Sequence, residues 1–319
     1  MSDNVNTTMN GTQPWSCPSN PTAEKIGITS AYCVILIFSL AGNTVIGIIV
    51  YKTKTMRKPI NFFIVNMAMS DLLFPIFLIP WRIQTLYKDS WLIGGPLGQV
   101  LCKLVSFLLE VSLGVSIQSL VLIAVDRFGV VVYPLRSPLI SSKLCPFFIL
   151  ATWIVALALF SPYLFSKLVQ YPGRLACRLH WNEVFGEFFE NYYVAFLIIL
   201  IIIAFLLITI LYIIIYAKLK SQNTVALGQQ SASVGQQRQQ RERNVLKMAT
   251  AIVLMFAVCW LPFSINWLLL IFASDILPCS SLYFSDVAFF MMRINCVINP
   301  SICFIFSSNY RDGLKTLFR

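Results

Sequence analysis

Hydrophobic residues in this chain gather into long runs that are separated by short polar stretches. The seven runs lie at about 27–51, 61–86, 100–132, 144–165, 190–217, 245–272 and 283–306. About 20 apolar residues in a helix, at a rise of 1.5 Å per residue, match the ~30 Å hydrocarbon core of a bilayer. Barrel strands would instead alternate polar and apolar residues, and the stretch 199–215 does not alternate. The pattern therefore predicts an all-α membrane protein, a seven-transmembrane helix bundle in which each helix satisfies its own backbone hydrogen bonds.

Composition and charge agree with this pattern. The chain is 58% hydrophobic and 12% charged, whereas about a quarter of the residues in a soluble domain are charged. Its net charge is +11, and most of the basic residues lie in alternate connections, among them Lys52, Lys54, Arg57 and Lys58. The positive-inside rule places these connections in the cytoplasm and the N-terminus outside. The charge thus indicates topology and contact with the lipid bilayer, and not nucleic-acid binding.

The polar stretches divide the chain into three expected parts. These are an extracellular N-terminus (1–26), a transmembrane domain (27–306), and an amphipathic eighth helix with a short cytoplasmic tail (307–319). The N-terminus carries glycosylation sequons at Asn6 and Asn10. A Gln- and Ser-rich segment at about 221–237 is expected to be a flexible third intracellular loop.

Polar residues inside apolar runs are costly in lipid and are therefore candidates for function. They include Asn43 in the first run, Asp71 in the second, Asp126-Arg127 in the third and Asn299-Pro300 in the seventh. Together with the Cys-Trp-Leu-Pro segment at 259–262, this pattern resembles the rhodopsin-like (class A) G-protein-coupled receptors over residues 27–319. The resemblance implies a plasma-membrane receptor without enzymatic activity. Its cytoplasmic partners would be a heterotrimeric G protein and arrestin.

The resemblance assigns a switch to the cytoplasmic end of the third helix. Arg127 would pair with Asp126 at rest and with the G protein on activation, because an arginine cannot shed its charge and must keep partners. Two sets of partners for one cation form a two-state switch. Glu242 stands where some family members hold this arginine from the sixth helix. The alternatives are a solvated helix charge for Glu242 and a simple interfacial anchor for Asp126-Arg127. The further switch residues that the resemblance implies are Tyr212, Trp260, Asn299 and Pro300.

A second expected site is an ion site inside the bundle. Asp71 with Asn43, Ser116, Asn295 and Asn299 resembles the sodium site of the family, and a carboxylate with hydroxyl and amide oxygens suits a hard cation. The alternative is a protonated Asp71 that is hydrogen-bonded without an ion. We expect no other cofactor, because no His, Cys and carboxylate set has the spacing of a metal site.

Cysteines on the outer side are expected to form disulfides, since the exterior is oxidising. The resemblance implies a bridge between Cys102, at the start of the third helix, and Cys177 in the second outer loop. Cys17 and Cys279 are also both external, so we infer a second bridge between the N-terminus and the third outer loop.

The residue types in the expected pocket indicate what class of ligand the protein binds. Leu109 stands where aminergic relatives carry an aspartate, and Arg293 stands where opsins carry their Schiff-base lysine. The expected pocket residues are Arg82, Leu109, Glu110, Trp260, Phe263, Trp267, Asp286, Phe289 and Arg293. Charged and aromatic groups around a wide vestibule suit a peptide. Glu110 and Arg293 either pair with each other or meet charges of the ligand.

The chain most resembles receptors of the somatostatin, galanin and neuropeptide type, so an extracellular peptide is the expected ligand. A class A receptor for a lipid or another small molecule is the alternative. Three positions depart from the family pattern, namely Cys303 in place of the NPxxY tyrosine, Ala204 in place of the fifth-helix proline, and Phe128 after Arg127. These departures leave a weakly coupling scaffold or decoy of the same fold as a further alternative.

Overall fold

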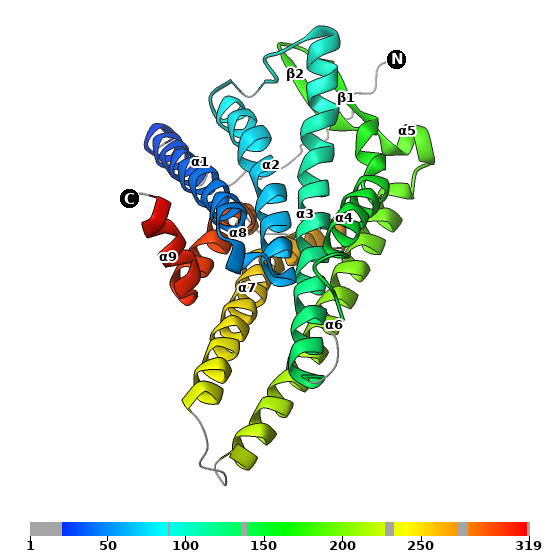
Figure 1. The fold of residues 1–319 in the computed structure, drawn as a ribbon. Helices are drawn as coiled ribbons and strands as arrows, with labels where there is room; N and C mark the ends of the chain where they lie inside the picture. The colour runs from blue at the N-terminus through cyan, green and yellow to red at the C-terminus, as the bar shows by residue number, and fades with distance from the viewer. Residues whose placement is uncertain (1–20, 89, 135–138, 227–232, 273–279, 318–319) are drawn as a thin grey trace, which may run out of the picture.

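The computed structural model describes residues 21–88, 90–134, 139–226, 233–272 and 280–317. Long helices form a bundle (Figure 1): α1 (Pro21–Lys52), α2 (Pro59–Lys88), α3 (Gly95–Val132), α4 (Cys145–Leu159), α6 (Phe189–Ala226), α7 (Ser233–Phe272) and α8 (Ser280–Phe306). The shorter elements are η1 (Lys54–Met56), η2 (Ser161–Phe165), β1 (Ser166–Tyr171), β2 (Arg174–Leu179), α5 (Trp181–Phe185) and α9 (Ser308–Leu317). The predicted helical bundle is confirmed.

Six of the described helices are long and apolar enough to cross a bilayer, and α4 is shorter, with 15 residues. The apolar run that contains α4 continues to residue 165, but the helix ends at Leu159. Pro162, which has no N–H to donate, lies in the following 3₁₀ segment η2 and does not continue an α-helix. The chain thereby leaves the bundle earlier than the hydrophobic pattern alone predicts.

Two other boundaries differ from those expected. The first helix begins at Pro21 and not near residue 27, and proline is favoured at the first position of a helix because its missing N–H is not needed there. Helix α6 extends to Ala226, and helix α7 begins at Ser233. Both helices therefore include part of the 221–237 segment that was expected to be a flexible loop. Only 227–232 of that segment lie outside the described residues.

The bundle exposes many apolar side chains on its outside and buries several polar ones within. Phe147 on α4 is 66% exposed and Ile203 on α6 is 55% exposed, whereas Asn66 and Asp71 are buried. Lipid, and not water, is the solvent that suits such an outer surface, because polar groups inside a membrane must find partners in the protein.

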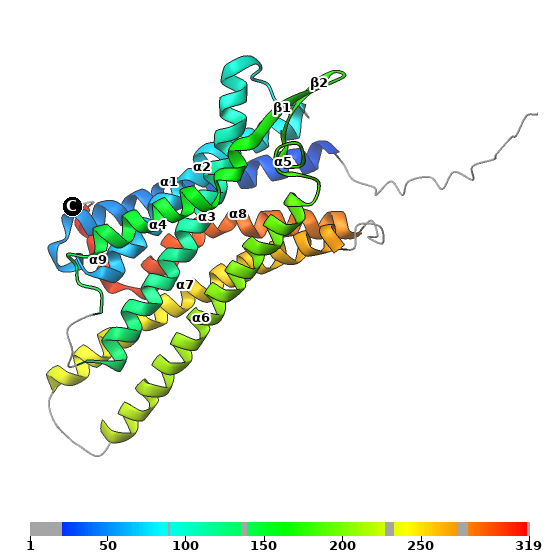
Figure 2. The same cartoon turned by 90° about the vertical axis from the view of Figure 1, so that its right-hand side faces the viewer.

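Helix α3 is the centre of the bundle and packs against α2, α4, α6 and α7 (Figures 1 and 2). Its approach to the end of α4 depends on Gly114. A Cβ atom at Gly114 would come within 2.5 Å of the Phe160 ring and 3.2 Å of Ala156. Glycine is therefore required for this contact, which holds α3 and α4 together beside the cavity described below.

Asn66 on α2 connects three helices through its side-chain amide. Its Nδ2 donates to Ser119 Oγ on α3 at 3.0 Å and to Thr152 Oγ1 on α4 at 3.1 Å. Its Oδ1 accepts from Trp153 Nε1 at 2.9 Å. Three of the four hydrogen-bonding capacities of the amide are thus used inside a buried site, where polar networks specify one arrangement of helices.

We expect Asn66→Ala to destabilise the bundle, because Trp153 Nε1 then loses its acceptor. A buried polar group left without a partner costs about 1–3 kcal/mol. The measurement is the midpoint of thermal unfolding of the purified protein in detergent. Ser301→Ala is the matched control, since that hydroxyl only donates to Val297 O within its own helix on an exposed face. Equal midpoints for the two variants would contradict the prediction.

The predicted amphipathic C-terminal helix is confirmed as α9, which contacts α1 and α8. Tyr310 is its buried anchor, at 1% exposure, and its hydroxyl donates to Asn61 Oδ1 at 3.2 Å. Burial raises the pKa of Tyr310, so the hydroxyl keeps the proton that it donates. Leu314 and Leu317 pack against the same core, while Lys315 is exposed.

Candidate functional site

A cavity of about 710 Å³ lies among α2, α3, α4, α6, α7 and α8. Its volume is in the range of ligand pockets, roughly 300–1,000 Å³. The expected pocket residues in its wall are Arg82, Leu109, Glu110, Trp260, Phe263, Trp267, Phe289 and Arg293. Asp286 is exposed and does not line the cavity, so this predicted pocket residue contributes no wall. The tertiary structure thus brings the other eight together from four helices.

Aromatic rings form a continuous ladder along α7 at this cavity. Trp260 stacks on Phe256 at 5.8 Å between ring centroids and meets Phe263 edge-on at 5.6 Å. Phe263 in turn contacts Phe289 on α8 at 5.3 Å. Trp260 also borders a second, small cavity that contains Asp71. The large cavity and the predicted ion site thus share lining residues, namely Trp260, Phe74, Leu109, Leu113 and Met292.

Arg293 is 6% exposed and lies in an aromatic cage. Its guanidinium carbon is 5.3 Å from the ring centroids of both Tyr32 and Phe289, a cation–π distance. The Nη1 group donates to the Tyr32 hydroxyl, and the Nε group is buried without a partner. The charge is therefore held by π-systems and a hydroxyl, and by no carboxylate among the described residues.

Glu110 also faces the cavity, but it does not pair with Arg293. Its carboxyl group lies near Tyr163 of η2, which lines the same cavity. The sequence left open whether the two charges neutralise each other or meet the ligand. The structure excludes their direct ion pair.

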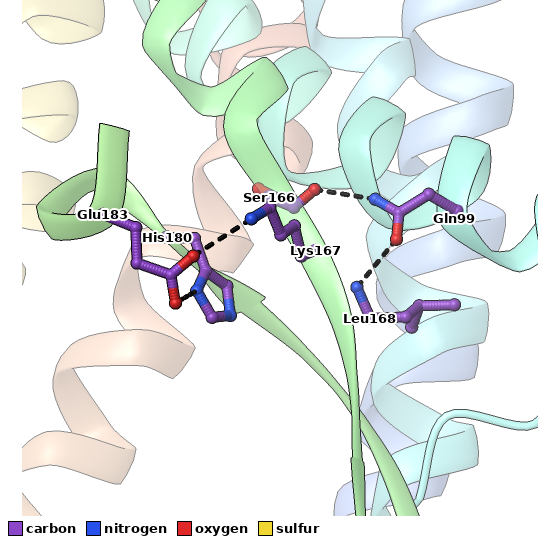
Figure 3. Close-up of polar contacts among 6 residues, drawn as sticks. All are labelled: Gln99, Ser166, Lys167, Leu168, His180 and Glu183. Carbon is purple, nitrogen blue, oxygen red and sulfur yellow. Dashed lines mark hydrogen bonds and ion pairs between the residues drawn. The ribbon is translucent and has the colours of Figure 1, made fainter. Parts of the chain in front are cut away.

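A β-hairpin made of β1 and β2 is anchored to α3, as Figure 3 shows for its first strand. Gln99 on α3 donates from Nε2 to Ser166 O at 2.8 Å and accepts from Leu168 N at 2.9 Å. Leu168 is paired with Cys177 on β2, and the expected Cys102–Cys177 disulfide is present. Two independent links thus hold the hairpin to one helix end.

Sequence analysis missed this hairpin, although its turn had a signal. Pro172 and Gly173 separate two short alternating segments, and Gly173 has a φ of 76°, which suits the third position of a type II turn. At the end of β2, Glu183 accepts from Lys167 Nζ at 3.0 Å and pairs with His180 at 2.8 Å (Figure 3). Lys167, and then His180, lower the pKa of Glu183.

The predicted polar cluster is assembled around Asp71, which is 3% exposed. Its Oδ1 accepts from Ser116 Oγ at 3.0 Å, and its Oδ2 accepts from Asn299 Nδ2 at 2.8 Å. A cavity of about 20 Å³ borders Asp71, Ser116 and Asn295. Asn43, also predicted for this site, does not line the small cavity; its Nδ2 donates to Cys296 O at 2.9 Å.

Three amide oxygens of the predicted ion-site residues are buried without a hydrogen-bond partner. They are the Oδ1 atoms of Asn43, Asn295 and Asn299. Ser112, which the sequence did not single out, also lines the small cavity; its position one helical turn before Ser116 was the available signal. Amide and hydroxyl oxygens around a buried carboxylate are a donor set that a hard cation prefers.

At the other end of α3, Asp126 and Arg127 are both buried, at 3% and 7% exposure. Asp126 Oδ2 accepts from Arg127 Nη2 at 2.5 Å and from Nε at 3.0 Å. Tyr212 on α6 packs nearby in the same core, and its buried hydroxyl has no described partner. A buried pair that includes an obligate cation is what the switch hypothesis requires.

Several predicted features lie outside the described residues. They are the sequons at Asn6 and Asn10, the Cys17–Cys279 bridge, and the side chain of Glu242. The contact between Arg127 and Glu242 therefore stays a prediction.

Fold and site together define a class of protein, a multi-pass helical membrane protein. It has a ligand-sized cavity next to the aromatic ladder of α7, and a buried arginine, Arg127, at the other end of α3. A family model described as 7 transmembrane receptor (rhodopsin family) matches residues 42–302. The chain belongs to this receptor family.

Its relatives include receptors that are named for peptides. The neuropeptide FF receptor 2 of Mus musculus is 31% identical over 314 residues, which cover 91% of this chain and 72% of the relative. The neuropeptide Y receptor type 2 of Sus scrofa is 30% identical, with coverages of 92% and 76%. The somatostatin receptor type 5 of Bos taurus is 29% identical, with coverages of 96% and 79%.

Proposed function

We propose that this receptor lies in the plasma membrane with its N-terminus outside, is activated by an extracellular peptide, and transmits the signal to a heterotrimeric G protein. Arrestin is a further proposed partner at the same cytoplasmic face. The observation that carries the proposal is the 710 Å³ cavity, lined by charged and aromatic side chains beneath an anchored hairpin. The names of the relatives support a peptide as the ligand class.

The described contacts suggest how ligand binding in the large cavity is transmitted to the cytoplasmic end of α3. A ligand that contacts Trp260 acts on a side chain that borders both cavities. A shift of that indole changes the packing around Asp71, and Asp71 is linked to α8 through Asn299. The route ends at Arg127, whose present partner Asp126 must be exchanged when a G protein docks.

A neuropeptide library applied to cells that express the receptor tests the proposal, with G-protein activation as the readout. We expect at least one peptide to activate, and cells without the receptor to stay silent. Binding of a peptide without activation at any concentration would favour the scaffold or decoy, for which Cys303 and Ala204 are the motivating departures. Silence with all peptides, combined with activation by a lipid library, would overturn the peptide proposal.

The lipid or small-molecule alternative has an observation of its own. The large cavity continues between α3, α4 and α6, where it is bordered by Gln118, Thr152, Val155 and Ile201. Val155 is 52% exposed, so this part of the cavity faces the surface that lipid covers. An apolar ligand could enter there from the bilayer.

We also propose that the Asp71 cluster binds sodium in the resting receptor. Replacing N-methyl-D-glucamine by sodium should then raise the midpoint of thermal unfolding, by about 1.4 kcal/mol of stability at ten times the dissociation constant. Asp71→Asn should remove the difference between the two cations, because it removes the carboxylate that the ion needs. Asp286→Asn, at an exposed position, is the control and should keep it. A wild-type receptor that is indifferent to the cation has no such site.

A further inference from the structure

Two arginines in the wall of the large cavity form no ion pair with an acidic side chain in the part of the chain that the structure describes. Arg82 on α2 and Arg293 on α8 both line it. The Nε atom of each is buried without a hydrogen-bond partner. Among the described residues neither guanidinium forms an ion pair, and the two lie close enough to repel each other electrostatically.

Neither of the acidic side chains nearby forms an ion pair with these arginines. Glu110 lies in the cavity wall, near Tyr163. Asp286 interacts with Arg293 electrostatically without forming an ion pair, and it is exposed. A buried cation without a counter-charge is costly, and a carboxylate of the ligand would supply the missing charge.

We infer that Arg82 and Arg293 form a subsite for a carboxylate of the ligand, which rests on the proposed function as a peptide receptor. Guanidinium groups match a carboxylate because they present paired N–H donors in a planar fork. Phe289, whose ring centroid is 5.3 Å from the Arg293 guanidinium carbon and which lines the cavity, supplies an apolar flank for a neighbouring side chain. The ligand would therefore be a peptide with a free C-terminus or an acidic residue at this position, and not one with an amidated, neutral end.

Two matched probes test the subsite without knowledge of the natural ligand. N-acetyl-phenylalanine carries the carboxylate, and N-acetyl-phenylalaninamide carries a neutral amide in its place. The purified full-length receptor is titrated with each probe, and the shift of the unfolding midpoint gives an apparent affinity. We expect the carboxylate to bind at least about tenfold more tightly, which corresponds to about 1.4 kcal/mol.

Variants of the two arginines test whether these residues cause the preference for the carboxylate probe over the amide probe. Arg82→Gln and Arg293→Gln should each reduce it, and the double variant should abolish it. Arg178→Gln, at an exposed position of β2, is the control and should leave it unchanged. N-acetyl-aspartic acid amide, compared with its asparagine analogue, separates a side-chain carboxylate from a C-terminal one.

A readout without any probe guards against variants that simply misfold. Since the Arg82 guanidinium has no described partner, Arg82→Gln should leave or raise the unfolding midpoint of the free receptor. A lower midpoint would mean that the arginine is paired within the protein, and would overturn the inference. No difference between the carboxylate and amide probes, including no binding of either, overturns it as well. An arginine-dependent preference in a receptor that no peptide activates would support the subsite while the peptide proposal fails.

Discussion

Arg127→Ala is expected to abolish G-protein activation while the receptor still reaches the cell surface and binds its ligand. The reason lies in the position of Arg127 at the cytoplasmic end of α3, with its guanidinium held by Asp126 at 2.5 Å. A docking G protein needs the cation that this variant lacks. The large cavity and its lining residues are untouched by the change. Surface labelling, ligand binding and G-protein activation are measured on the same cells.

Stability must be separated from signalling in that experiment. Arg127→Ala leaves Asp126 buried without its cation, and breaking such a pair costs about 3–5 kcal/mol. Asp126→Asn/Arg127→Ala removes the orphaned carboxylate, so it should be more stable than the single variant and reach the cell surface in larger amounts, but it should not couple. Arg57→Ala, in the exposed turn after α1, is the matched arginine control and should couple normally. Full coupling by the Arg127→Ala receptor would refute the switch.

Removal of the Cys102–Cys177 bridge is expected to have the second large effect. The two cysteines are 75 residues apart in the sequence, and closing a loop of that length is worth about 4 kcal/mol in the chain-entropy account. Without the bridge, the hairpin keeps only contacts such as those of Gln99 with Ser166 and Leu168. We therefore expect a lower unfolding midpoint and a loss of ligand response in Cys102→Ala/Cys177→Ala.

The control for the disulfide is Cys33→Ala, because Cys33 is a free, exposed cysteine on α1. The midpoint of this variant should equal that of the unmodified receptor. A reducing agent should lower the midpoint of the unmodified receptor and of Cys33→Ala, but not that of Cys102→Ala/Cys177→Ala. If the double variant responds to ligand with unchanged potency, the bridge does not position the hairpin.

The predicted sites differ in how much the structure adds to them. Asp71 and Asn299 were expected to meet, and their hydrogen bond of 2.8 Å places them together. Ser112 also lines the same small cavity, but it was not predicted. Serines on helices are common, and the direction of this side chain depends on how α3 is rotated. The partner of Arg293 was also undecided. Tyr32, on a helix 261 residues earlier, contacts it only because α1 and α8 pack together.

The sequence by itself determined those features that the bilayer requires of each segment separately. A membrane demands about 20 apolar residues per helix and makes each internal charge conspicuous, so the spans, the Asp126-Arg127 pair and Asp71 could be found without coordinates. The tertiary structure alone decided where α4 ends, how the β-hairpin is attached, and that Glu110 and Arg293 stay apart. These outcomes depend on the rotation and contact of whole helices, because a side chain acquires its partners only when neighbouring elements fix which face it presents.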